Sequence, residues 1–151
     1  MQWQDEATKL PCLIVRNRAG ALCGYVGITS NHPWFELEYD DALDGSMDTD
    51  YTKPTPERLI TVHGGLTFSN SCQPTTDESH GICHLPEPGE PDHVWWFGFD
   101  CSHCNDYSPM MDKYHSNPLP GQNVYRTISY VQSQCASLAK QLLHWQTNAP
   151  T

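Results

Sequence analysis

The residue types best suited to bind a metal or to transfer protons lie in one short segment. Residues 94–99 are Val-Trp-Trp-Phe-Gly-Phe and carry no charge. Directly after this run come the side chains that can act as ligands, acids or bases: Asp100, Cys101, His103, Cys104 and Asp106. An apolar strand covered on both faces would bring this polar group to its end. We therefore expect a binding or catalytic site at the end of this strand.

A second candidate is His63, which precedes the pair Gly64-Gly65 and follows the apolar segment 58–62. Glycines beside a histidine allow another group to approach closely. If the two apolar segments are neighbouring strands, His63 lies near the first cluster. A histidine could then act as a general base oriented by a carboxylate. The catalytic candidates are His63, Asp100, His103 and Asp106.

Zinc is one possible cofactor, because Cys101-x-x-Cys104 has the spacing of a zinc knuckle with His103 inside it. A structural zinc site needs four ligands, and Cys72, Cys83 or His84 could complete the set. The metal candidates are Cys101, His103, Cys104, His63 and Cys83. Two alternatives stay open. The cysteines can pack as small apolar residues, or Cys101 beside His103 can be a thiol nucleophile.

Charge and length limit the class of protein. The chain has 151 residues, 38% of them hydrophobic, and a net charge of −10. This length suits one domain, residues 1–151. The negative charge disfavours direct binding of nucleic acid or of an anionic membrane. It suits a partner protein with a basic surface, or it simply keeps the protein in solution.

The most acidic part is residues 31–57, which we expect to be a loop. Its leading carboxylates, the candidate partner-binding residues, are Glu36, Glu38, Asp40 and Asp41. A solvated loop without a partner is the alternative reading. No segment has the ~20 apolar residues of a membrane span, and the polar start is not a secretory signal. We expect a cytosolic location and therefore reduced cysteines.

The expected fold is α+β, a mainly antiparallel sheet of four to five strands with one long C-terminal helix packed across it. Residues 12–16 and 22–28 predict a hairpin, and 58–68 and 94–99 predict two further strands. Residues 1–10 are expected to be frayed. Apolar residues at spacings of three and four predict a helix over 123–145, capped by Asn123. A coiled-coil partner is the competing use of that stripe.

Several motifs together resemble a family of small bacteriophage and prophage proteins to which no activity is assigned. The motifs lie at residues 22–27, 62–69 (Val-His-Gly-Gly-Leu-Thr-Phe-Ser), 81–84, 95–103 with Asp106, 125–126 and 130–131. The likeness spans residues 10–143. Cys104 departs from the family pattern, which has a small residue there. The resemblance implies a phage-type protein that works in a bacterial host.

Two hypotheses follow for the function. The first is an acidic accessory protein that binds and modulates a host protein, such as a nucleic-acid-handling or anti-CRISPR-like defence complex. The second is a metal-dependent hydrolase of a nucleotide-like or phosphoester substrate. The chain has neither His-Glu-x-x-His nor Gly-x-Ser-x-Gly. The sequence leaves the oligomeric state open.

Overall fold

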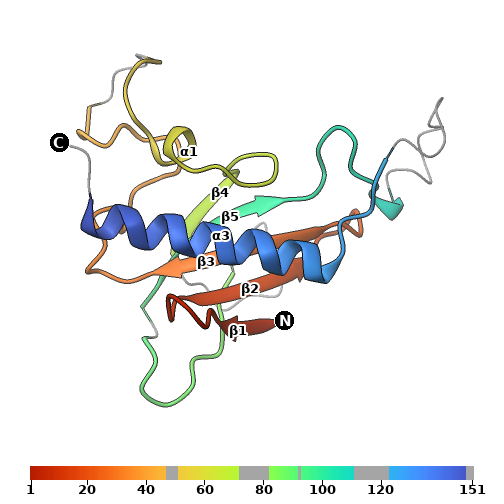
Figure 1. Cartoon of the computed structure of the whole chain (residues 1–151), viewed down its shortest axis with the longest axis horizontal. Coiled ribbons are helices and arrows are strands. Elements are labelled where there is room, and N and C mark those ends of the chain that lie inside the picture. The colour runs from red at the N-terminus through yellow and green to blue at the C-terminus, as the bar shows by residue number, and fades with distance from the viewer. Residues whose placement is uncertain (47–50, 72–81, 92, 111–122, 149–151) are drawn as a thin grey trace.

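The sheet and one long helix dominate the computed structural model, which describes residues 1–46, 51–71, 82–91, 93–110 and 123–148 (Figure 1). The sheet is antiparallel, with strand order β1-β2-β3-β5-β4. The elements are β1 (Gln2–Gln4), β2 (Pro11–Arg16), β3 (Leu22–Ile28), α1 (Pro56–Leu59), β4 (Phe68–Ser71), β5 (Trp95–Asp100) and α3 (Ile128–Thr147). The predicted α+β class is confirmed.

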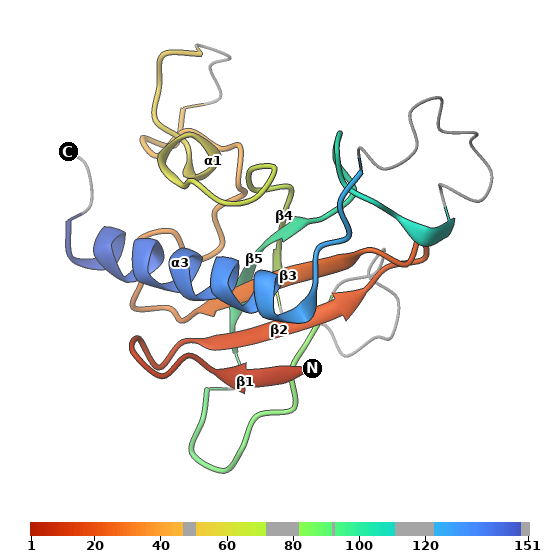
Figure 2. The same ribbon diagram turned by 45° about the vertical axis from the view of Figure 1, so that its right-hand side comes forward.

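The helix α3 lies across one face of the sheet, against β2 and β3 (Figure 2). Its buried side chains follow the predicted apolar stripe: Val131, Cys135, Leu138, Ala139 and Leu142. Because this stripe packs on the chain's own sheet, it is not available as a coiled-coil seam. Within the described part of the chain, no helix is long and apolar enough to cross a membrane.

In the central strands β3 and β5, three aromatic residues each lie opposite a glycine of the neighbouring strand: Tyr25, Trp96 and Phe99. Phe99 lies opposite Gly24 and Tyr25 lies opposite Gly98. A Cβ atom on Gly24 would lie 2.4 Å from Phe99 Cζ and 2.8 Å from Cys135 Sγ. The absent side chain therefore lets the Phe99 ring lie flat and lets α3 approach β3. A glycine inside a strand is typical of such a close approach.

The structure differs from the sequence-based expectation at residues 1–10, at residues 58–68 and at the start of α3. Residues 1–10 carry the edge strand β1 instead of a frayed end, and the Met1 amine donates to Ile14 O at 2.9 Å. The expected strand over 58–68 is divided: Thr55 caps the short helix α1, and β4 begins only at Phe68. Between them Gly64 and Gly65 adopt φ of 68° and 82°, which ends an extended strand.

The helix begins at Ile128, five residues later than expected, and Thr127 is its N-cap, not Asn123. The Thr127 hydroxyl accepts from Tyr130 N at 3.3 Å. Val124 is instead extended: its N–H donates to Asn105 O at 2.8 Å and its carbonyl accepts from Tyr107 N at 2.9 Å. Val124 follows the apolar period, but these backbone bonds keep it out of the helix.

Replacing Gly24 with alanine should destabilise the fold by about 1–3 kcal/mol, because the new methyl group overlaps the Phe99 ring. The free energy of unfolding from urea titration measures this. The exposed helix residue Ala136 supplies the control: Ala136→Ser should change it by less than about 0.5 kcal/mol. Equal stability of Gly24→Ala and the control would contradict the proposed close approach.

Candidate functional site

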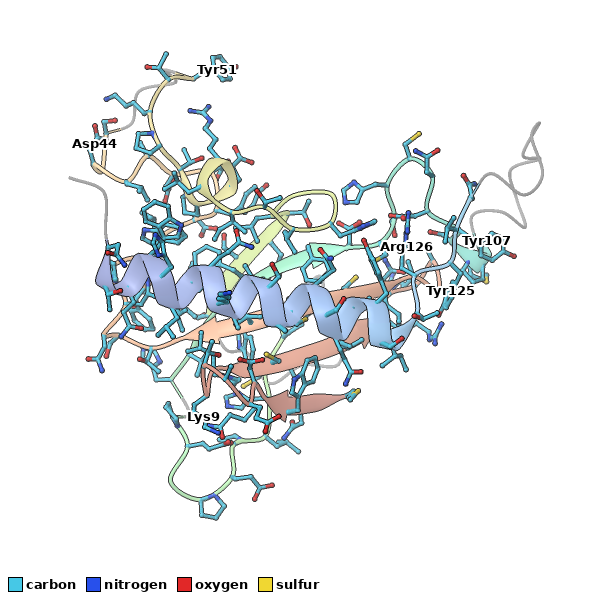
Figure 3. The ribbon with its side chains drawn as sticks, in the orientation of Figure 1. Lys9, Asp44, Tyr51, Tyr107, Tyr125 and Arg126 are labelled. Carbon is cyan, nitrogen blue, oxygen red and sulfur yellow. The ribbon has the colours of Figure 1, made fainter. Side chains whose placement is uncertain are left out.

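The candidate site forms where the end of β5, the turn after α1 and the start of α3 meet. Residues 101–106 follow β5 and bring Asp106, the turn at 63–65 brings His63, and the segment before α3 brings Arg126. Figure 3 shows Arg126 on the same side of the molecule as Tyr107 and Tyr125. The expected proximity of His63 to the tip of the tryptophan strand is confirmed, whereas its catalytic role stays a prediction.

Asp106 is the centre of this cluster, and its side chain is only 1% exposed. Its Oδ2 lies 2.8 Å from His63 Nε2 and accepts the His103 backbone N–H at 3.1 Å. Its Oδ1 accepts from Arg126 Nε at 2.8 Å. Burial by itself raises the pKa of the Asp106 carboxyl, but the bonds from His63, Arg126 and the His103 N–H outweigh it and lower the pKa. The buried group is therefore a carboxylate.

His63 joins Asp106 to the helix. While its Nε2 faces the carboxylate, its Nδ1 lies 2.8 Å from the Tyr130 hydroxyl. The rings of His63 and Tyr130 meet edge to face at 5.4 Å. The His63 backbone N–H donates to Gln134 Oε1 at 2.9 Å, which fixes the turn against the next turn of α3. Both ring nitrogens thus have defined partners.

His103 and Asp100 form a second pair beside the first. The His103 ring lies directly on Gly64, where a Cβ atom would come within 2.2 Å of it. Its Nε2 is 3.2 Å from Asp100 Oδ1, without hydrogen-bond geometry. The Asp100 Oδ2 accepts from the Thr67 hydroxyl at 2.9 Å. The ring centroids of His63 and His103 are 6.2 Å apart, so all four catalytic candidates lie together.

The sulfur ligands of the predicted zinc site are not gathered in the same way. Cys101 is buried, and burial, followed by the charges of Asp106 and Asp100, raises the pKa of its thiol to about 12. This also disfavours Cys101 as a thiolate nucleophile. Cys104 is exposed. Cys83 belongs to a disulfide, contrary to the expectation of reduced thiols throughout, so it offers no thiolate.

Two further residues, Cys72 and His84, were predicted to complete the zinc site. His84 packs edge-on against Trp96, at 5.2 Å, in the apolar cluster on the side of the sheet away from α3. Cys72 lies outside the described residues. Among the residues that the structure describes, no three His, Cys, Asp or Glu side chains are arranged to hold a metal ion. Bound zinc therefore stays a prediction.

Arg126 and Tyr130 are the members of the cluster that sequence reasoning did not select. Arg126 lies just before the N-cap Thr127, and Tyr130 lies in the first turn of α3. The Arg126 Cζ lies 5.2 Å from the centre of the Tyr130 ring. The motif at 125–131 contained both residues, but only the folded chain shows that they meet His63 and Asp106.

The acidic candidates form a separate surface, which we call the acidic strip: Glu36, Glu38, Asp40 and Asp41. All four side chains are exposed. The apolar residues between and around them point inward, and Trp34 is only 2% exposed. Figure 3 shows the neighbouring Asp44 at the opposite end of the molecule from Arg126. Within the described part of the chain, none of the four carboxylates of the strip bonds to a residue of the histidine cluster.

Comparison of the chain with protein-family models, with curated proteins and with solved structures found no match. The bacteriophage resemblance therefore stays a prediction.

Replacing Asp106 with asparagine should lower the free energy of unfolding at neutral pH by about 2–3 kcal/mol, because Arg126 and His63 lose a buried carboxylate. The pKa of Asp106 is depressed, so its contribution is present above the unfolded value of about 3.9 and disappears as the pH falls through the folded value. The stability gap between wild type and variant should therefore narrow in acid.

Asp100→Asn is the matched control, since Asp100 is partly exposed and bonds to the Thr67 hydroxyl. Urea titrations at several pH values measure both variants. Two results would contradict the central role of the Asp106 charge. One is a loss of unfolding free energy in Asp100→Asn as large as that in Asp106→Asn. The other is a difference in unfolding free energy between wild type and Asp106→Asn that does not change with pH.

Proposed function

We propose that the protein binds a basic surface of another protein through the acidic strip. The observation that carries this proposal is the division of residues 34–43 into exposed carboxylates and inward apolar side chains. Solvation alone does not require an acidic segment to be anchored. A preorganised charged surface, in contrast, increases the rate of encounter with an oppositely charged partner.

Specific contacts anchor the segment that carries the acidic strip. The Trp34 ring stacks on Trp145 of α3 at 6.0 Å, and Trp95 Nε1 donates to Leu37 O at 2.9 Å. The Ser69 hydroxyl donates to Glu38 Oε2 at 2.5 Å and accepts from Tyr39 N at 2.9 Å. These bonds attach the strip to the core, to β5 and to β4. The carboxylates are therefore held in place before a partner arrives.

Lysine and arginine side chains of the described residues do not neutralise the negative charge of the strip. Within the described residues, the four carboxylates form no ion pair with lysine or arginine, whereas Lys53 pairs with Asp44 at 3.2 Å. The local field is visible at Tyr39: burial, and then the charges of Asp40, Glu57 and Glu38, raise the pKa of its phenol. A basic side chain of a partner would relieve this repulsion.

The setting of this interaction follows from the family resemblance. We propose a phage-type accessory protein in the bacterial cytosol whose partner is a host protein with a basic surface, such as a nucleic-acid-handling or defence complex. Such complexes carry basic grooves for nucleic acid, which the acidic strip would match in charge. The strip is supported by the geometry, and the setting by the motifs alone.

The variant Glu36→Lys/Asp40→Lys should bind a short lysine-rich peptide several-fold more weakly than wild type at low salt. The reason is that the attraction of the strip is replaced by repulsion. Fluorescence anisotropy of the labelled peptide measures the binding. The variant leaves Glu38 and Asp41, which bond within the strip, in place.

Glu6→Lys/Glu87→Lys makes the same change in net charge at exposed positions elsewhere and should bind as wild type does. Host proteins captured from a bacterial lysate by wild type and by this control should be lost with the strip variant. Equal binding by the two variants, or binding that added salt does not weaken, would contradict the proposal.

A second candidate is hydrolysis of a phosphoester or nucleotide-like substrate at the histidine cluster. Its support is the assembly of His63, Asp106, His103 and Asp100 at one place. Elemental analysis and chelator treatment test the metal-dependent form. Stoichiometric zinc, with turnover but not folding lost on chelation, supports it. Metal-free protein that retains turnover would contradict it.

A further inference from the structure

Tyr130 stands at the outer end of a chain of hydrogen bonds that begins at a buried carboxylate. Asp106 Oδ2 is 2.8 Å from His63 Nε2, and His63 Nδ1 is 2.8 Å from the Tyr130 hydroxyl. Asp106 is buried, His63 is partly buried, and Tyr130 is partly exposed. A nucleophile in contact with a base that a third group orients is the arrangement common to catalytic triads.

The protonation states along this chain follow from the carboxylate. Because Asp106 is ionised, it accepts a hydrogen bond, so His63 Nε2 carries a proton. In the neutral imidazole the other nitrogen, Nδ1, is then an acceptor. The Tyr130 hydroxyl therefore donates to His63 Nδ1, which is the nitrogen that can remove its proton.

Arg126 places a positive charge beside the same phenol. Its Nε is bound to Asp106 Oδ1, and its Cζ lies 5.2 Å from the centre of the Tyr130 ring. Its two terminal nitrogens form no hydrogen bond within the described part of the chain. They can stabilise the phenolate and bind two oxygens of a phosphoryl group, for which a guanidinium is well shaped.

We propose that Tyr130, His63 and Asp106 form a metal-free phosphoryl-transfer site in which Tyr130 Oη is the nucleophile. His63 is the general base, Asp106 is the positioning residue, and Arg126 holds the phosphoryl oxygens of a phosphodiester substrate. This activity goes beyond the binding of a basic partner and does not depend on the acidic strip.

The chemistry balances with water as the only co-reactant. The Tyr130 oxygen attacks phosphorus while its proton passes to His63 Nδ1. The bond from phosphorus to the leaving alkoxide breaks, and the imidazolium returns the proton to that alkoxide. Water then attacks the phosphotyrosine, His63 removes a proton from the water, and this proton restores the phenol. The net reaction is hydrolysis of one phosphoester bond.

The chain supplies a matched comparison in Tyr51. This residue is 87% exposed and also has a guanidinium over its ring, with Arg58 Cζ at 5.6 Å. Among the described residues, no histidine lies in ring contact with Tyr51. Figure 3 shows it at the other end of the molecule from Arg126. A difference in reactivity between the two tyrosines therefore reports on the His63–Asp106 pair and not on exposure or on the nearby cation.

The test is labelling of the intact chain with a dialkyl fluorophosphate, followed by peptide mass spectrometry at each tyrosine. The reagent forms the same oxygen–phosphorus bond and releases fluoride. Tyr130 should be labelled about 10²-fold faster than Tyr51, which is the contribution of a positioned general base. Its rate should follow the formation of an unprotonated imidazole as the pH rises, and not the ionisation of a phenol.

Variants complete the test. Tyr130→Phe should abolish this label and leave that of Tyr51 unchanged, and His63→Gln should reduce the Tyr130 rate to that of Tyr51. If His63→Gln does not fold, the pH dependence of the wild-type rate still decides. Labelling of Tyr51 as fast as Tyr130, or a Tyr130 rate that follows phenol ionisation, would overturn the proposal.

Discussion

The architecture around the candidate site depends on one buried negative charge. A carboxylate with 1% of its side chain exposed is stable only when its oxygens are fully bonded, and Asp106 obtains these bonds from His63, Arg126 and the backbone of residue 103. The three donors come from three separate segments. The bonds therefore fix the turn after α1, the loop after β5 and the segment before α3 relative to one another.

The two proposed activities depend on different residues and on different physical properties. In the binding proposal, the four carboxylates of the acidic strip attract a partner because they are exposed and form no ion pair with lysine or arginine among the described residues. In the phosphoryl-transfer proposal, the charges of the histidine cluster pair with one another, and its hydrogen bonds set the proton positions. The first would act over a distance and the second at contact distance. Neither arrangement needs the other, so each can be tested alone.

The sequence predicted the elements that hydrophobic periodicity and local sequence pattern determine. Uninterrupted apolar residues identified β5, and the spacing of Val131, Cys135, Leu138 and Leu142 identified α3. The proximity of His63 to the end of β5 was expected if residues 58–68 and 94–99 were neighbouring strands; the contact is present although the first segment is divided between α1 and β4. The start of α3 was misplaced, because Val124 continues the apolar period while its backbone pairs with Asn105 and Tyr107. Arg126 and Tyr130 were missed as site residues, because their role depends on a contact that only tertiary packing creates.

The tautomer of His63 tests the central claim most directly. Nitrogen-15 and proton NMR of the imidazole should show a proton on Nε2 in a strong hydrogen bond and an unprotonated Nδ1 at neutral pH. In Asp106→Asn this signal should move toward that of the exposed His144, whereas in Tyr130→Phe the Nε2 proton should remain. A His63 spectrum equal to that of His144 in the wild-type protein would contradict the account.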